Sequence, residues 1–133
     1  MNRPEGGARK LGFKEKLPEN CPPPNSHTKG CGEAYRLIPN DKPIFDDFAS
    51  YGAKNVPLPD GMDLCRWSSC SLYADMATVQ KKRKLPKLRG YPFVAKLKIA
   101  ASSGHILEKS KHIDFWMFDT FDPVAAVVAV ECL

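Results

Sequence analysis

The sequence lacks any apolar run long enough to span a membrane, which needs about 20 residues. Its first residues, Met-Asn-Arg-Pro-Glu-Gly-Gly, also lack the apolar core of a secretory signal peptide. Several enzyme motifs are missing too, since the chain contains no GxGxxG, Walker, GxSxG or HExxH pattern. The lack of a membrane span and of a signal peptide predicts a cytoplasmic protein that does not associate with membranes.

Cysteine is present but lacks the spacing of a zinc ribbon or a full disulfide framework. The five cysteines include no CxxC pair and their number is odd, so we expect free thiols. Cys21, His27 and Cys31 come nearest to a ligand set, but prolines surround them and a fourth ligand is missing. No metal site is therefore expected.

Large apolar side chains are scarce in residues 1–32, which are rich in proline. Such a segment buries too little surface to offset the entropy lost on ordering. We expect a flexible Pro-rich N-terminal arm over residues 1–32. The rest, residues 33–133, has a length that suits one domain.

This domain contains a pattern of short helices and strands. Ile44, Phe48 and Tyr51 form one apolar stripe that predicts a first helix, and Asp75 caps a second helix over 76–84. The strands are predicted at 34–38, 67–73, 93–99, 112–118 and 124–130. The last strand is a β-branched apolar run and is expected in the centre of the sheet. The order indicates an α+β fold with two short helices and a bent or split, mainly antiparallel sheet.

Basic residues concentrate in one block, although the net charge is only +5. Between Lys81 and Lys98 the chain carries no acidic residue and the following basic ones: Lys81, Lys82, Arg83, Lys84, Lys87, Arg89, Lys96 and Lys98. This block is typical of a surface that binds nucleic acid or an acidic protein. A solvated helix end followed by a strand with one wet face would have the same composition.

Residues 66–73 carry an unusual row of side chains. A strand's period of two places four of them on one face: Trp67, Ser69, Ser71 and Tyr73. Each hydroxyl buried without a partner costs about 1–3 kcal/mol, so a dry core is a poor place for this row. A cleft in which a polar ligand meets an aromatic wall suits it better, and a half-exposed strand with serines facing water is the alternative.

Three titratable side chains on other predicted strands belong to the same candidate site. Arg36 lies inside the first strand, where a rigid backbone would present its planar fork to a phosphate or a carboxylate. His112 and Asp114 share one face of a later strand with Trp116, which is expected in the core. An imidazole and a carboxylate thus become neighbours.

Tyr35-Arg36-Leu37, Ser69-Cys70-Ser71 and Asp114 together resemble the ADP-ribosyltransferase family, in which a strand arginine precedes a Ser-x-Ser strand, a helix and a late acidic residue. The resemblance extends over residues 33–133. Cys70 stands where the family commonly has threonine, and Asp114 is one methylene shorter than the usual glutamate.

The resemblance implies an ADP-ribosyltransferase-like fold and an enzyme that takes NAD as substrate and cleaves its nicotinamide glycosidic bond. Asp114 would stabilise the charge that develops on the ribose, with His112 beside it as a ribose or phosphate contact. The residues implied in binding NAD are Arg36, Ser69, Ser71 and Tyr73. Such a transferase, for example a toxin or effector, would modify an acceptor that the sequence does not identify, either a protein or a nucleic acid.

Two other classes of function are compatible with the sequence. In the first, the protein is a non-catalytic binding module whose surface from Lys81 to Lys98 holds nucleic acid or an acidic protein. In the second, it is a small inhibitor or immunity-type protein that acts by occupying a partner. A transferase-like fold without catalysis would also be consistent, because fold and function are separable.

Overall fold

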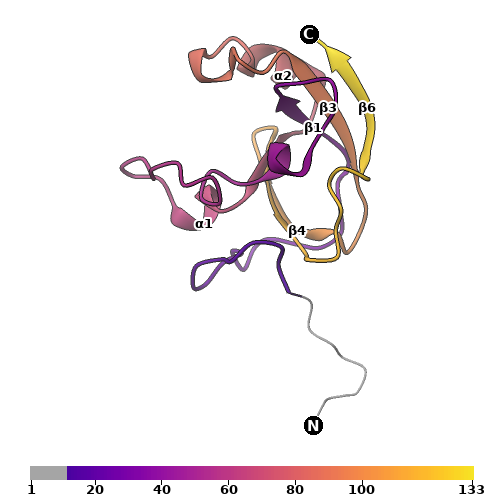
Figure 1. The fold of residues 1–133 in the computed structure, drawn as a ribbon. Helices are drawn as coiled ribbons and strands as arrows, with labels where there is room; N and C mark the ends of the chain where they lie inside the picture. Colours follow the sequence, from indigo (N-terminus) through magenta and orange to yellow (C-terminus); the bar gives the residue numbers. More distant parts are fainter. Residues whose placement is uncertain (1–11) are drawn as a thin grey trace.

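The computed structural model describes residues 12–133, which Figure 1 draws as a ribbon coloured along the sequence. Their strands form one antiparallel sheet of six in the order β4-β5-β2-β1-β3-β6. The strands are β1 Gly32–Ile38, β2 Cys70–Tyr73, β3 Phe93–Ile99, β4 Gly104–Lys109, β5 His112–Met117 and β6 Val127–Cys132. The connections contain α1 Leu64–Trp67, α2 Met76–Lys82 and the 3-10 turns η1 Phe45–Phe48 and η2 Pro86–Leu88. The α+β class predicted for a small single domain is confirmed. Neither α-helix in this range has the length or apolar character of a membrane span.

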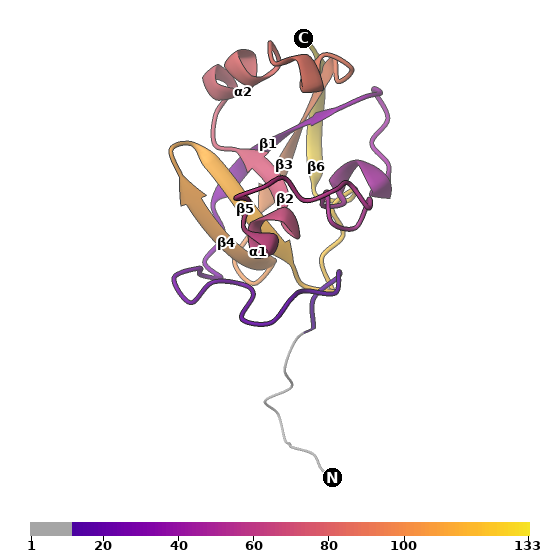
Figure 2. The same ribbon diagram turned by 90° about the vertical axis from the view of Figure 1, so that its left-hand side faces the viewer.

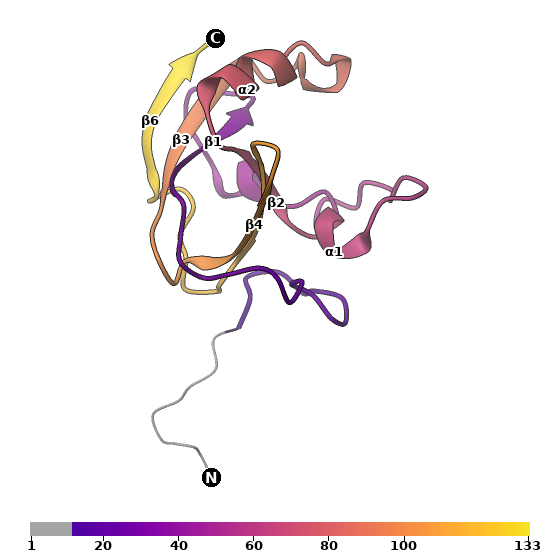
Figure 3. The same ribbon diagram turned by 180° about the vertical axis from the view of Figure 1, so that it is seen from behind.

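The curved sheet buries apolar side chains on both faces. Leu97 and Ile99 of β3 point into the main core, which also holds Leu72 of β2 and Phe115 of β5. Val94 points to the other face, where it joins a smaller cluster beneath α2. Figure 3 shows β3 and β6 side by side along one flank of the molecule, with α2 at one end. The second face is left open beyond this small cluster, and the candidate site lies there.

The apolar run at residues 124–130 is not a central strand. β6 begins only at Val127 and lies at the edge of the sheet, where Val128 is 57% exposed. The Asp122 carboxylate accepts hydrogen bonds from the backbone N–H groups of Val124 and Ala125, so the first half of the run forms a turn. An edge position was wrongly predicted as a central one because hydrophobicity does not specify strand order.

Residues 12–31 lie against the domain instead of extending from it as an arm. Phe13 forms an isolated bridge with Phe118, and His27 forms one with Ile106 on the outer side of β4. A disulfide joins Cys21 to Cys65 of α1, so the expectation of free thiols is wrong for these two cysteines. The remaining part of the predicted arm, residues 1–11, lies outside the described residues.

The helices differ from the predicted ones in extent. The first is reduced to the single turn η1, because the side chain of Arg36 occupies the carbonyl groups of Asp47 and Ala49. The second, α2, is capped by Asp75 as predicted, and it ends at Lys82 instead of Lys84.

Two elements were not anticipated at all, α1 and β4. Asp63 starts α1 by accepting a hydrogen bond from the backbone N–H of Arg66, so Trp67 belongs to this helix and not to a strand. β4 begins at Gly104, where a side chain would collide with the Trp116 carbonyl group at 2.2 Å.

Candidate functional site

A cleft of about 350 Å³ opens over β2 and β5, and α1 and the segment from α2 to η2 line it as well. Figure 2 shows α1 on one side of these two strands and α2 on the other. The floor of the cleft contains Ser71 and Tyr73 of β2 and His112 and Asp114 of β5. The register of these strands pairs Ser71 with Asp114 and Tyr73 with His112, so the four residues form one square. The structure thus brings together four of the six residues that the sequence singled out.

Alternation along β2 separates a polar face from an apolar one. Ser71 and Tyr73 are half-buried and line the cleft, whereas Cys70 and Leu72 are buried on the opposite face. Trp67 belongs to α1, so the prediction that it is a strand residue is wrong. It still lines the cleft, where its ring stacks on that of Tyr51 with 4.7 Å between the centroids.

Asp114 is the most constrained residue of the floor. Its side chain is 7% exposed, and one carboxylate oxygen accepts a hydrogen bond from Arg66 Nε at 3.0 Å. The other oxygen lies 3.1 Å from Ser69 Oγ, whose single proton is shared with the nearer Arg66 carbonyl group at 2.7 Å. Ser69 is itself buried and does not line the cleft. Its hydroxyl orients Asp114 from behind, which differs from the predicted contact with a ligand.

His112 lies between an aromatic ring and a carboxylate. Its Nδ1 is 3.6 Å from Asp114 Oδ1, and its ring meets that of Tyr73 edge-on at 5.8 Å. Burial lowers the pKa of His112, and the Asp114 carboxylate opposes this change only in part. The imidazole is therefore neutral at pH 7. Burial also raises the pKa of Tyr73, which keeps its hydroxyl protonated.

Arg36 lies in a recess that adjoins the cleft and shares Ser71, Tyr73 and Tyr51 with it. β1 and β2 pair through a single register position, Tyr35 with Tyr73, and the guanidinium group lies where the strands diverge. It donates hydrogen bonds to the carbonyl groups of Asp47 at 2.8 Å, Ser71 at 2.8 Å and Ala49 at 3.3 Å. Arg36 thus connects η1 to β2, and fewer of its donors are left for a phosphate than the sequence suggested.

Cations surround the cleft. The cationic side chains that line it come from three segments and are Arg66, Lys82, Lys87 and Lys109. Asp114 is the only carboxylate among the lining residues, and it is already paired with Arg66. Lys82 and Lys87 belong to the predicted basic block, but Arg66, Lys109 and Tyr51 were missed. For Arg66 a signal existed, since Asp63 three residues earlier is a helix cap.

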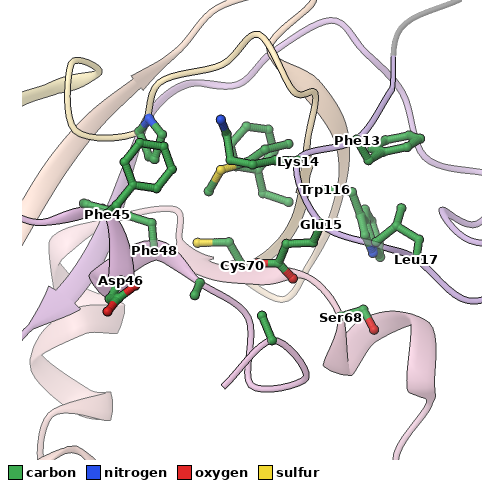
Figure 4. Close-up of a pocket in the computed structure, with 15 residues that line it drawn as sticks. Phe13, Lys14, Glu15, Leu17, Phe45, Asp46, Phe48, Ser68, Cys70 and Trp116 are labelled. Atoms are coloured by element: carbon green, nitrogen blue, oxygen red, sulfur yellow. The ribbon is translucent and has the colours of Figure 1, made fainter. Parts of the chain in front are cut away.

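A second cavity of about 280 Å³ lies on the opposite face of β2 and is largely apolar. Figure 4 shows Cys70 pointing into it near Phe48 and Glu15, with Phe13 and Trp116 at another wall. The Glu15 carboxylate is occupied by the backbone N–H and the hydroxyl of Ser50. Burial raises the pKa of the Cys70 thiol, so this cysteine is a poor nucleophile.

Across residues 12–133, no group of three or more His, Cys, Asp or Glu side chains is arranged to hold a metal ion. No family model, curated protein or solved structure matches the chain. The geometry of the cleft is therefore the basis for assigning a function.

Proposed function

We propose that the cleft binds NAD and that the protein is an ADP-ribosyltransferase with an ADP-ribosyltransferase-like fold. The observation that carries the proposal is the adjacency of three strands. β1, β2 and β5 are neighbours, and they bring Arg36, Ser71 and Asp114 to one connected depression, although these residues are far apart in the sequence.

The size and chemistry of the cleft fit a dinucleotide. Its volume of about 350 Å³ falls within the roughly 300–1,000 Å³ of small-molecule sites, and the Arg36 recess extends it. Lys82 and Lys87 supply positive charge for a pyrophosphate. Tyr73 on the floor supplies a flat apolar surface for the nicotinamide ring.

The floor residues have the properties that glycosidic cleavage requires. When the bond from ribose C1 to the nicotinamide nitrogen breaks, both bonding electrons leave with nicotinamide and positive charge develops on the ribose. The Asp114 carboxylate stabilises that charge once Arg66, whose side chain is 47% exposed, turns from it to a phosphate of the substrate. An acceptor O–H or N–H then bonds to C1, and neutral His112 accepts the proton that is released.

A non-catalytic binding module is the second candidate function. The observation that favours it is that Arg36 and Asp114 already have internal partners, three carbonyl groups for the first and Arg66 with Ser69 for the second. In this alternative the cations and aromatic rings bind a nucleotide or an acidic partner, and no bond is cleaved.

Calorimetric titration with NAD, combined with chromatographic measurement of released nicotinamide, tests the proposal. We expect a Kd in the micromolar range or weaker, which corresponds to a binding free energy of about −8 kcal/mol or less favourable. Lys82→Ala should weaken binding, whereas Lys98→Ala, an exposed lysine of β3 outside the cleft, should not. Asp114→Asn should leave Kd nearly unchanged and slow nicotinamide release roughly 100-fold or more, because its charge acts only in the transition state.

Two outcomes would contradict the proposal. If folded protein shows no binding at millimolar NAD, the cleft does not take a dinucleotide. If NAD binds but wild-type protein releases no nicotinamide with any acceptor supplied, the binding module becomes the better description.

A further inference from the structure

We infer that the acceptor of the proposed reaction is a single-stranded nucleic acid, which lies with its phosphates along one side of the cleft, the segment from Lys81 to Arg89. This inference rests on the proposed function. It names the acceptor class that the proposed function leaves open.

This segment contains several cations and no acidic residue. Its cations are Lys81, Lys82, Arg83, Lys84, Lys87 and Arg89, and all but half-buried Arg83 are exposed. Within residues 12–133, the ion pairs engage Arg66, Lys96 and Lys111, and none engages a cation of this segment. The dipole of α2 explains Lys81 and Lys82 in its last turn, since cations are favourable at a helix C-terminus. It does not explain the cations that follow the helix.

The segment is also connected to the reactive floor. Lys82 and Lys87 line the cleft together with His112 and Asp114, so a polyanion bound to these lysines would lie next to these two groups. Figure 2 shows α2 above β2 and β5, with α1 on the other side. Lys109 adds a cation where β4 ends. A phosphate track therefore runs up to the site of transfer.

The opposite side of the cleft offers stacking surfaces. Trp67 and Tyr51 stack on each other at 4.7 Å, and Trp67 is further held by a hydrogen bond from its Nε1 to the Val56 carbonyl. A fixed aromatic pair across from a row of cations matches the way in which proteins bind single strands, with bases on aromatic rings and phosphates on basic side chains. The carboxylates of an acidic protein would use only the cations, whereas each nucleotide of a strand supplies both a phosphate for the cations and a base for the rings.

Depth favours a single strand over a duplex. Asp114 is 7% exposed and His112 is 26% exposed, so both lie at the floor of the cleft. A base within a duplex reaches such a floor only after it is extruded, whereas a base of a single strand enters it directly.

NAD and the strand are the only reactants of the transfer step. A hydroxyl or amino group of the strand forms a bond to C1 of the ribose, and the bond from C1 to nicotinamide breaks. Nicotinamide leaves with the bonding electrons, and the proton of the acceptor goes to His112. The products are nicotinamide, ADP-ribosylated strand and one proton.

The first test is fluorescence anisotropy with fluorescein-labelled 12-mers of oligo-dT and oligo-U, a DNA duplex of the same length, and polyglutamate. We expect both single strands to bind roughly tenfold more tightly than the duplex and the polyglutamate. The slope of log affinity against log salt should be about −0.7 per contacted phosphate. Equal or tighter binding of polyglutamate or duplex would overturn the inference.

A matched pair of charge reversals locates the surface. Lys84→Glu should weaken the single strands about tenfold and leave the Kd for NAD unchanged, because Lys84 does not line the cleft. Lys29→Glu changes the charge equally on an exposed lysine of the segment before β1 and should have little effect. An equal response to both reversals would overturn the inference.

Incubation with labelled NAD and the same oligonucleotides separates this inference from the proposed function. Label on a single strand supports both. Nicotinamide release without any binding of oligonucleotide would overturn the acceptor assignment and leave the proposed function standing. Tight binding of oligonucleotide by protein that does not bind NAD would overturn the proposed function and the acceptor assignment with it.

Discussion

The two faces of β2 differ sharply although the strand is only 4 residues long. On one face, the half-buried Ser71 and Tyr73 open to a cleft surrounded by cations. On the other face, Cys70 and Leu72 belong to the main core, and Cys70 also lines an apolar cavity. A period of two separates ligand chemistry from packing within one short segment.

Substitutions on one face of β2 therefore test function, and substitutions on the other face test stability. A substitution on the apolar face removes contacts that hold the sheet together. A substitution on the cleft face mainly removes polar groups that are half-exposed. The two faces should therefore respond differently to the same assays.

The largest effect is expected from Phe115→Ala on the apolar face. Phe115 is 1% exposed and meets Phe121 edge-on at 5.2 Å between centroids. Truncation should cost about 3–5 kcal/mol of unfolding free energy, because lost burial and a new cavity add together. Urea denaturation followed by circular dichroism measures it. Tyr73→Phe on the cleft face is the matched control and should cost less than about 1 kcal/mol; similar costs at both positions would refute the contrast between the faces.

Removal of the disulfide should have the next largest effect. Cys21 and Cys65 are separated by 44 residues, and closing such a loop stabilises a fold by about 2–4 kcal/mol. The variant with both cysteines changed to serine should lose that amount in urea denaturation. Non-reducing peptide mapping should recover a linked Cys21–Cys65 peptide. A map in which either cysteine pairs with Cys132 would contradict the structure.

This disulfide also bears on the cleft face. Cys65 lies in α1, which carries Arg66 and Trp67, and its carbonyl group accepts a hydrogen bond from Trp116 Nε1 at 3.0 Å. We expect the serine variant to weaken NAD binding, because α1 loses its covalent link. We expect the packing of the apolar core to stay largely unchanged. Disulfides are typical of oxidising compartments, and the cytoplasmic location stays a prediction from the sequence.

The sequence predicted well what a short-range pattern decides. Alternation placed Ser71 with Tyr73 and His112 with Asp114, and the cap at Asp75 marked the start of α2. It also placed Trp116 in the core, where it is 1% exposed. Each of these depends on neighbours within a few residues.

Long-range partners were beyond such patterns. The Cys21–Cys65 disulfide and the ion pair of Arg66 with Asp114 join distant parts of the chain. Strand order is equally nonlocal, which is why β6 was predicted at the centre. The roles of Ser69 and Arg36 changed for the same reason, because their partners come from β5 and from η1.

A smaller effect is expected from the ion pair on the cleft floor. Asp114→Asn and Arg66→Gln should each destabilise the fold, and the double variant should show a coupling of about 1 kcal/mol by urea denaturation. The coupling energy stays low because the Arg66 side chain is 47% exposed, so solvent screens its interaction with Asp114. Arg83→Gln, which removes a cation without an ion pair among residues 12–133, serves as the control for charge. A coupling near zero would show that Asp114 does not depend on Arg66.

The smallest effect concerns the dependence of stability on pH, to which His112 in the cleft and His105 near the apolar cavity both contribute. Burial lowers the pKa of each below its ordinary value of about 6.5, and only His112 has a carboxylate that opposes the change. A histidine with a lowered folded pKa stabilises the fold above the unfolded pKa. That contribution is lost as the pH falls from about 6.5 through the folded pKa, because protons bind preferentially to the unfolded chain. Unfolding free energy should therefore decrease below pH 6.5, and His112→Gln and His105→Gln should each flatten the decrease.

NMR titration of the imidazole signals distinguishes the two histidines. In wild-type protein both midpoints should lie below the ordinary value. Asp114→Asn should lower the midpoint of His112 further, because it removes the one neighbour that favours the imidazolium, and it should leave His105 unchanged. A His112 midpoint above pH 7 would mean that the carboxylate outweighs burial. The imidazole would then be charged near pH 7, and it would be unsuited to accept the proton of an acceptor in the proposed reaction.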